Sequence, residues 1–513
     1  MQSIKSISYV LYLTLFFVTF KYTVIQMAAP YIVGSLGGSN TTATYAVAFF
    51  GLGNALTIPL GKPMMQRLPL PHFFSICLLL DLFLSILAIT TTYYPIFLLA
   101  RFLIGTVSGP FYYVVYKLLS DLFKPEEKRP VLSLLVAILT ITPVLGACWG
   151  GWLAYNYNWR WIYHFNSIIA LFILFYCYPK VKNLNIDLPK TSFDWIGFIS
   201  YSISIFCLCF VAIMGQELDW FRSHLITACA ILGSFFFIFF ILWQFKTKEP
   251  LLDLAVFKIP TVSLGLFCLA FIFATYFGVI SLLSLWLNLD ANYTPLWIIV
   301  MLLVMVISSF FPWFLIEKKL RNIDLRIPLS IAVIFLSISC IHASIFTDQI
   351  NFGRIVFSRF IAGIGIAFFL PPIFQLCFRH TPLEKAPSVF AILQVIRSLS
   401  GSIGLSIYYT IWLRRQVFYH SRLGEDLTVF SANTKEFFSK AKEIGIQTRQ
   451  ATGELEYYLN RRSTSLALDD SFDLMGWILV AMLIVFLVCT LFLDQSLFTA
   501  KSSETNRPTS KKV

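Results

Sequence analysis

The chain has 513 residues, of which 58% are hydrophobic and 13% are charged. An ordinary soluble domain has about a quarter of its residues charged, so this composition excludes a soluble globular protein and predicts a membrane protein. The net charge of +13 would suggest a nucleic-acid partner in a soluble protein. Here the basic residues lie between apolar segments, so they indicate membrane topology and no nucleic-acid partner is expected.

Apolar segments of about 20 residues, long enough to cross a hydrocarbon core about 30 Å thick, recur along the chain. They predict fourteen transmembrane helices near residues 7–33, 43–62, 73–92, 95–117, 130–154, 161–178, 194–214, 223–245, 261–288, 295–316, 328–346, 353–378, 385–412 and 474–493. The cysteines lie inside these segments without metal-ligand spacing, which predicts neither disulfides nor a metal site.

The distribution of basic residues predicts the orientation. Short loops after every second span carry eighteen Lys or Arg, against three in the short loops of the other face. The positive-inside rule therefore places both termini and the basic tail 494–513 in the cytoplasm, and we expect a plasma membrane, the inner membrane of a bacterium. The long polar loop 413–473 falls on the outer face. It is interpreted either as a solvated cap over the exit or as a dock for a periplasmic partner.

An Arg-Phe-x-x-Gly pattern occurs twice inside apolar segments. Arg101 and Gly105 carry the first copy, and Arg359 and Gly363 repeat it near the start of another long span. An arginine in hydrocarbon is costly unless it faces a protein interior or a wet cavity, so both are candidate functional residues. The spacing predicts a duplicated membrane bundle. Residues 1–178 form the first six-helix bundle, residues 179–260 two inserted helices, and residues 261–493 the second bundle.

Three strings carry a resemblance to a known family. They are TPVLGACWGGW at 142–152, followed by NWRWIY at 158–163, then GQELDW at 215–220 and RSLSGSIG at 397–404. With them the chain resembles the fourteen-helix drug:proton antiporter branch of the major facilitator superfamily. The resemblance implies an all-α fold of two six-helix bundles that rock around a central site. It also implies multidrug-type export of a small amphiphilic compound in exchange for protons, with no enzymatic activity and no cofactor.

The first string contains glycines spaced for helix contact. Gly146 and Gly150, with Gly151 beside them, allow two helix backbones to approach closely, as does Gly109 in span 4. Pro143 precedes them in the same span. These residues are interpreted either as tight packing or as a gating hinge.

The chain departs from the family pattern at one turn and within one helix. In the turn between spans 2 and 3, Arg67 is the one charged residue kept from the family's usual turn sequence. The helix-1 motif that ends at Pro30 lacks the family's acidic residue. Lys21 directly precedes this motif, and Gln26 lies within it. A membrane-buried carboxylate there would be an obvious proton site. This protein has no carboxylate at that position.

The charged residues predicted inside the bilayer allow three interpretations. Lys21 and Arg101 fall at the same depth, Asp81 is the only carboxylate well inside an apolar segment, and Arg397 lies near mid-depth of span 13. The cations either stabilise the bundle through carbonyls and Asp81, or form an electropositive cavity for anionic substrates, since arginine suits carboxylate and phosphate. In the third interpretation Asp81 carries protons.

Aromatic residues extend the candidate pathway. Tyr112 and Tyr116 are predicted to line an apolar wall for a ligand, although such residues are more often core. The sequence contains no phosphate-binding Gly-Lys-Ser/Thr loop, so ATP-driven transport is not expected. Two alternatives to multidrug export stay open: an exporter of an anionic, carboxylate-rich metabolite such as a siderophore, and a membrane receptor or scaffold that transports nothing.

Overall fold

A computed structural model describes residues 2–124, 127–182, 192–319, 323–347, 349–428, 430–493 and 497–498. The predicted tail 494–513 therefore lies outside the described residues, except for residues 497 and 498. Every regular element in the described ranges is helical. The α-helices are α1 (Gln2–Thr23), α2 (Ala29–Leu36), α3 (Tyr45–Thr57), α4 (Gly61–Arg67), α5 (Leu70–Thr90), α6 (Tyr94–Leu122), α7 (Lys128–Asn156), α8 (Trp161–Val181), α9 (Trp195–Met214), α10 (His224–Lys246), α11 (Pro260–Leu289), α12 (Pro295–Lys319), α13 (Arg326–Ala343), α14 (Phe352–Ala367), α15 (Leu370–Phe378), α16 (Ala386–Glu425), α17 (Ala432–Glu443) and α18 (Thr448–Leu491).

Twelve helical segments of the described chain, with α14 and α15 counted as one, are long and apolar enough to cross a membrane. The two other predicted spans are broken helices. In span 1, α1 ends at Thr23 and α2 begins at Ala29, with turns between them. In span 2, the 3-10 helix Ile58–Leu60 separates α3 from α4. Pro30 and Pro59 stand at these restarts, where the missing N–H of proline is tolerated.

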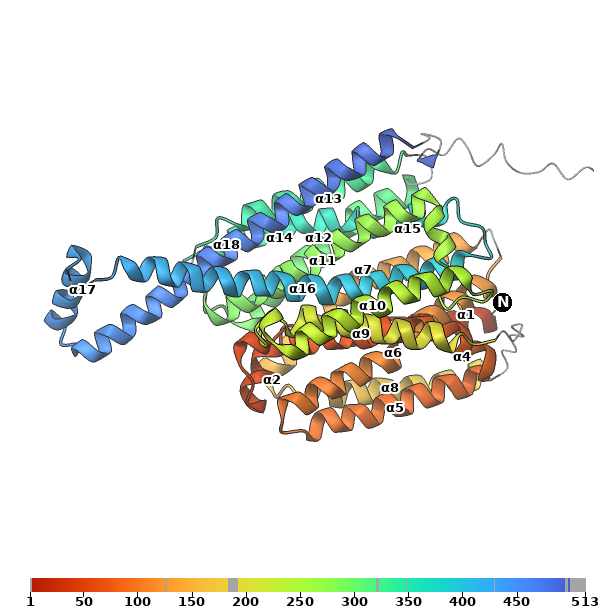
Figure 1. Cartoon of the computed structure of the whole chain (residues 1–513), viewed down its shortest axis with the longest axis horizontal. Helices are drawn as coiled ribbons and strands as arrows, with labels where there is room; N and C mark the ends of the chain where they lie inside the picture. Colours follow the sequence, from red (N-terminus) through yellow and green to blue (C-terminus); the bar gives the residue numbers. More distant parts are fainter. Residues whose placement is uncertain are drawn as a thin grey trace, which may run out of the picture.

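The helices form two bundles with two helices added between them (Figure 1). In the N-terminal bundle α3 packs on α6, α5 on α8, and α1 on α7; in the C-terminal bundle α11 and α18 pack on α16, and α12 on α14. Helices α9 and α10 pack on each other, and α9 also contacts α3 and α16. The two bundles meet where α3 contacts α16 and α7 contacts α12. This is the all-α two-bundle fold that the sequence predicted.

Glycines of the repeated pattern occupy equivalent places in the two bundles. A Cβ at Gly105 of α6 would collide with the carbonyl oxygen of Phe50 in α3. A Cβ at Gly363 of α14 would likewise collide with the carbonyl oxygen of Met305 in α12. Gly109 continues the first contact, since a Cβ there would lie 2.7 Å from the carbonyl oxygen of Asn54. In both copies glycine lets one helix touch the backbone of its neighbour.

The segment 413–473, predicted as a long polar loop on the outer face, is a helical hairpin. Helix α16 continues to Glu425, α17 forms the tip, and α18 starts at Thr448 and runs 44 residues into the membrane span. The segment contains no proline, and a capping box at Gln447 starts α18. The hairpin projects from the end of the molecule opposite the N-terminus (Figure 1).

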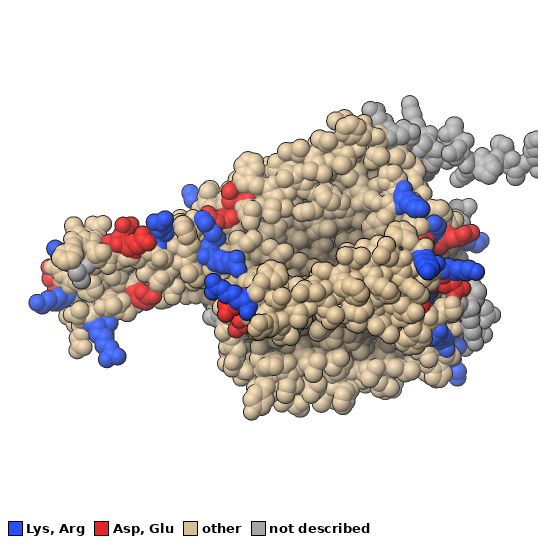
Figure 2. All heavy atoms as spheres, in the orientation of Figure 1, with Lys and Arg blue, Asp and Glu red and all other residues tan. Residues whose placement is uncertain are grey.

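Charge is confined to the two ends of the molecule. Figure 2 shows a broad band without Lys, Arg, Asp or Glu on this face, between the charged hairpin end and the charged N-terminal end. Apolar side chains such as Phe83, Phe235 and Ile307 are more than half exposed on the surface of the described chain. Hydrocarbon is the solvent that such a surface requires, so the protein is an integral membrane protein.

Candidate functional site

Five charged side chains are buried in the described part of the protein. They are Lys21, Asp81, Arg101, Arg359 and Arg397, each at most 2% exposed. Four are cations and one is an acid, so an acid can neutralise only one of them directly. The partners of each cation therefore decide which are structural and which are available to a ligand.

Lys21 is paired with the one buried acid. Its Nζ lies 2.6 Å from Oδ1 of Asp81, which joins α1 to α5 inside the N-terminal bundle. The same ammonium lies 4.4 Å from the ring centroid of Phe17. The pair is closed off from solvent, so it ties the two helices together and does not present a free positive charge.

Arg101 caps the break in span 1. Its Nη2 donates to the carbonyl oxygens of Lys21 at 3.1 Å and Tyr22 at 3.3 Å, and its Nε donates to that of Ala46 at 3.3 Å. Carbonyl groups in the last turn of a helix lack intrahelical donors, and a cation is favourable at that end. Lys21, Asp81 and Arg101 thus form one cluster within one bundle, whereas the predicted depths had grouped only Lys21 with Arg101.

The glycines of α7 pack against the same break. A Cβ at Gly146 would lie 2.8 Å from the carbonyl oxygen of Phe20, and one at Gly150 would overlap the carbonyl oxygen of Val24. A Cβ at Gly151 would lie 2.9 Å from Cβ of Met27. Pro143 lies inside the same helix. The close packing is a structural fact, whereas a hinge at these residues stays a prediction.

Arg397 lies between the two bundles. It belongs to α16, its Nη1 donates to the carbonyl oxygen of Leu139 in α7 at 3.4 Å, and Cζ lies 5.3 Å from the ring of Tyr112 and 5.4 Å from that of Phe273. Among the described residues, neither Nε nor Nη2 has a partner. Arg397 is also absent from the ion pairs of the described chain. Its charge is therefore buried at the bundle interface without an acid to neutralise it among the described residues.

Further polar groups lie around Arg397, and two of them, Gln394 and Tyr22, were missed by the sequence analysis. Gln394 precedes it by three residues on the same helix face, and both amide atoms lack partners among the described residues, as does the hydroxyl of Tyr112. Tyr22 donates across the interface to the carbonyl oxygen of Ser398 at 3.2 Å. Gln394 could have been found as a polar residue inside an apolar segment, whereas Tyr22 carries no comparable signal.

Gln26 also bridges the bundles. It lies in the break between α1 and α2, and its Nε2 donates to the hydroxyl of Ser281 in α11. A small pocket beside it includes Pro30, Ser284 and Asn288. The break in span 1 therefore contacts the C-terminal bundle directly, while its carbonyls are held by Arg101.

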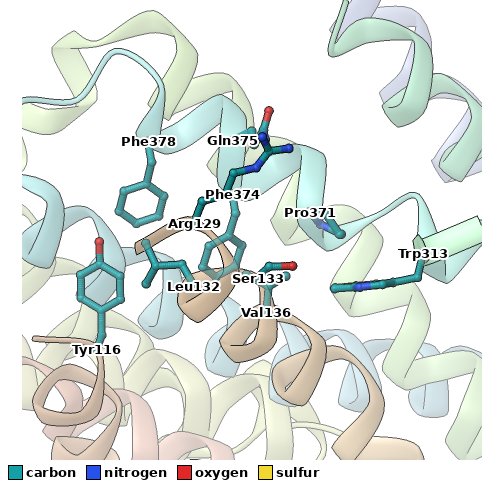
Figure 3. Close-up of a pocket in the computed structure, with 10 residues that line it drawn as sticks. All are labelled: Tyr116, Arg129, Leu132, Ser133, Val136, Trp313, Pro371, Phe374, Gln375 and Phe378. Atoms are coloured by element: carbon teal, nitrogen blue, oxygen red, sulfur yellow. The ribbon is translucent and has the colours of Figure 1, made fainter. Parts of the chain in front are cut away.

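A cavity of about 180 Å³ lies between the bundles near the start of α7 (Figure 3). We call it the chamber, and it is lined by Tyr116, Arg129, Leu132, Ser133, Val136, Trp313, Pro371, Phe374, Gln375 and Phe378. The ring of Tyr116 stacks on that of Phe390 in α16, with centroids 4.1 Å apart and planes at 10°. The predicted aromatic wall thus divides between two places, Tyr112 beside Arg397 and Tyr116 beside the chamber.

Two predicted arginines lie elsewhere. Arg359 donates to the hydroxyls of Ser339 at 3.1 Å and Ser358 at 3.0 Å, which places it between α13 and α14 inside the C-terminal bundle. Arg67 ends α4 and lies 5.3 Å from the ring centroid of Phe193. Neither joins the Arg397 site. Within the described residues no group of three or more His, Cys, Asp or Glu side chains could hold a metal ion.

Known proteins resemble this chain along almost its whole length. It is 26% identical to the fatty acid resistance protein FarB of Neisseria gonorrhoeae, over 90% of this chain and 91% of that protein. It is 25% identical to the multidrug export protein EmrB of Escherichia coli K12, over 90% of each. Solved structures with a similar fold include a bacterial homolog of the human lysosomal transporter Spinster, with a TM-score of 0.58, 14% identity and coverage of 97% of this chain and 98% of that one.

A second structure with this fold is a peptide transporter POT in complex with sulfate. Its TM-score is 0.60 at 12% identity, over 94% of this chain and 95% of that chain. The family model described as Major Facilitator Superfamily matches residues 11–405, which is most of the chain. The two-bundle fold, the membrane-exposed surface and this match agree with one another. The chain is a membrane transporter that belongs to the Major Facilitator Superfamily.

Proposed function

We propose that this transporter exports small amphiphilic compounds, and preferentially those with an anionic group, in exchange for protons. The two bodies that move are residues 1–178 and 261–493, with 179–260 inserted between them. The observation that carries the proposal is Arg397, a buried cation at the bundle interface with no acid partner among the described residues. A carboxylate would neutralise it with bidentate hydrogen bonds, which makes an anion the fitting ligand.

The surroundings of Arg397 favour an amphiphile. The rings of Tyr112 and Phe273 flank the guanidinium, so apolar surface and positive charge meet at one place. The relatives support this substrate class, because one is a fatty acid resistance protein and another is a multidrug export protein. A carboxylate-rich metabolite such as a siderophore is the second candidate, since the same cation would recognise its carboxylates.

Protons are proposed to act at the pair of Lys21 and Asp81. Asp81 is the one acid fully buried among the described residues. Protonation of Asp81 removes its charge and weakens the bond to α1 directly beside the break in span 1. That break contacts the C-terminal bundle through Gln26, so the protonation state of Asp81 is coupled to the fit between the bundles. Proton transfer therefore occurs away from the substrate cation.

The orientation follows from the charge of the short loops. We propose that both termini lie in the cytoplasm of a bacterial cell and that the membrane is the inner one. The helical hairpin 413–473 then projects into the periplasm. Its length and its exposed apolar side chains, among them Val417 and Phe430, suit it to contact a periplasmic partner protein.

A transport assay with two probes of opposite charge tests the proposal. Purified protein in proteoliposomes with an imposed proton gradient is offered 1-anilinonaphthalene-8-sulfonate, which is permanently anionic, or ethidium, which is cationic. Arg397→Gln should lower anion transport roughly tenfold or more, because a hydrogen bond to a charged group contributes about 1.5–3 kcal/mol. Arg397→Lys should retain part of it. Ethidium transport should not fall with Arg397→Gln.

The exposed cation Lys117 supplies the matched control. It lies on α6, is paired with Asp121 at the surface, and Lys117→Gln should leave transport of both probes unchanged. Equal loss of both probes in Arg397→Gln would contradict a charge-selective site. If the wild-type protein moves neither probe, with or without the gradient, the interpretation as a receptor or scaffold replaces that of an exporter.

The partner is tested by shortening the hairpin. Replacing α17 by a short Gly-Ser turn should leave transport in proteoliposomes unchanged, because α17 forms the hairpin tip (Figure 1) and begins only after α16 has run on from Arg397 to Glu425. The same variant should lose resistance to amphiphiles in cells if a partner docks there. Unchanged resistance would show that the hairpin has no partner in export.

A further inference from the structure

The chamber between the bundles has the chemistry of a second ligand site. Leu132, Val136, Phe374 and Phe378 give it apolar walls, and Arg129 brings a cation. In Figure 3 the guanidinium of Arg129 lies beside Gln375 at one end, and the apolar side chains fill the view below. Arg129 is the second residue of the 29-residue helix α7, where the helix dipole also favours negative charge.

We propose that the chamber is the loading site for a single-tailed amphiphile with one anionic head group, taken from the inner leaflet of the membrane. The inference rests on the proposed export function and names how the substrate reaches Arg397. The cavity volume of about 180 Å³ lies below the roughly 300–1,000 Å³ of pockets for drug-sized ligands, so one chain fits better than a ring system.

The position of the chamber favours a substrate dissolved in the membrane. It lies at the end of α7 that carries Lys128 and Arg129, which the charge distribution assigns to the cytoplasmic face. Leu134 follows the chamber residue Ser133 on α7 and is 47% exposed on the apolar surface. Helix α7 therefore contributes both to the chamber wall and, on an adjacent face, to the apolar surface. An amphiphile entering here keeps its tail in apolar surroundings and its head group beside Arg129.

The chamber and the Arg397 site are consecutive turns of the same helices. On α6, Tyr116 lines the chamber and Tyr112, one turn deeper, lies beside Arg397. On α7, Val136 lines the chamber and Leu139 accepts the hydrogen bond from Arg397. At 1.5 Å per residue, four residues separate the two places by only about 6 Å along the helix.

The stacked pair of Tyr116 and Phe390 separates the two places. Tyr116 belongs to the N-terminal bundle and Phe390 to the C-terminal bundle, and their stack closes the interface between them. On α16, Gln394 lies one turn deeper than Phe390 and Arg397 nearly two turns deeper. A head group that passes this pair therefore moves from Arg129 to Gln394 and Arg397. The stack acts as the inner gate.

Photolabelling tests the loading site directly. The full-length protein in lipid nanodiscs is exposed to a dodecanoate that carries a diazirine on its tail, and labelled peptides are identified by mass spectrometry. Labels should occur in residues 129–136 and 371–378. Ser133→Trp should reduce this labelling at least tenfold by filling the chamber, and the smaller change Ser133→Leu should reduce it severalfold. Leu134→Trp, the adjacent lipid-facing control, should change it less than twofold.

The head-group cation has its own variants. Arg129→Gln should weaken labelling by dodecanoate about tenfold, and Arg129→Lys should restore most of it, whereas labelling by a diazirine dodecyltrimethylammonium should not fall. Size-exclusion profiles and thermal unfolding show whether each variant is folded. Labels confined to lipid-facing helix surfaces, or undiminished labelling in a folded Ser133→Trp protein, would overturn the loading site.

Failure of the loading site can be distinguished from failure of the proposed export. If Ser133→Trp keeps transport of the diazirine dodecanoate in proteoliposomes while Arg397→Gln loses it, the chamber is not the route, although export through Arg397 stands. If the chamber is labelled as expected but the wild-type protein moves no probe, the binding site stands and the export function is refuted.

Discussion

The buried pair of Lys21 and Asp81 makes a strong quantitative prediction. Nζ and Oδ1 are 2.6 Å apart, and the side chains are 3% and 1% exposed, so water does not replace a lost partner. Lys21→Met leaves an uncompensated carboxylate in the bundle and should lower the free energy of unfolding by about 3–5 kcal/mol. Asp81→Leu should cost a similar amount. The double variant Lys21→Met/Asp81→Leu removes both charges and should return to within about 2 kcal/mol of the wild type.

The wild type, the two single variants and the double variant form a double-mutant cycle. Each protein is unfolded in mixed micelles with an increasing mole fraction of dodecyl sulfate, and tryptophan fluorescence measures its free energy of unfolding. We expect a coupling energy of at least about 3 kcal/mol. The surface pair of Lys117 and Asp121, 22% and 36% exposed, is the control and should show less than about 0.5 kcal/mol. A loss below about 1 kcal/mol in Lys21→Met, or a double variant no more stable than the weaker single one, would refute the reasoning.

Transport by the same double variant separates the two roles of the pair. If Asp81 carries protons, the double variant is stable but its transport no longer responds to the imposed proton gradient. If the pair is only structural, the response to the gradient is retained. Downhill exchange of the anionic probe without a gradient serves as the control, because it requires a folded protein with an intact Arg397 site and no proton movement.

Two further predictions concern a close backbone contact and a pH dependence. Gly150→Ala should lower the free energy of unfolding by about 1–3 kcal/mol, because the added Cβ overlaps the carbonyl oxygen of Val24. The control Gly453→Ala, in open space within α18, should raise the free energy of unfolding by up to about 1 kcal/mol. Equal effects of the two substitutions in dodecyl sulfate unfolding would contradict this prediction. Burial raises the pKa of Asp290 from 3.8 to about 7 against the opposing charge of Arg461. Between about pH 4 and about pH 7 the folded state therefore holds a proton that the unfolded state has lost. The free energy of unfolding should fall as the pH rises through this range, and Asp290→Asn should flatten its dependence on pH.

Much of the fold could be predicted from the sequence because lipid imposes a simple rule. A backbone in hydrocarbon must satisfy its hydrogen bonds internally, so apolar segments of sufficient length become helices. The repeat of Arg101 and Gly105 at Arg359 and Gly363 indicated two bundles, and the glycines do contact neighbouring backbones in both. The segment 413–473 was predicted only as a long polar loop and not as a helical hairpin, because polar composition shows where a helix leaves the membrane but not where it ends.

The roles of the buried charges required the tertiary structure. The sequence showed that Lys21, Asp81, Arg101 and Arg397 lie inside apolar segments, and depth alone grouped Lys21 with Arg101. It could not show that Arg101 caps a broken helix, because the end of α1 at Thr23 and its contact with the glycines of α7 are features of the folded bundle.

The sequence by itself thus determined the membrane environment, the helical class and the identity of the intramembrane charges, because these follow from composition and from the cost of charge in hydrocarbon. Only the tertiary structure decided which charge is neutralised. An ion pair or a carbonyl contact needs atoms within about 3–4 Å, and residues such as Leu139 and Arg397, far apart in sequence, reach that distance only when two bundles pack together. That packing pairs Lys21 with an acid, gives Arg101 three carbonyls, and leaves Arg397 at the interface between the two bundles.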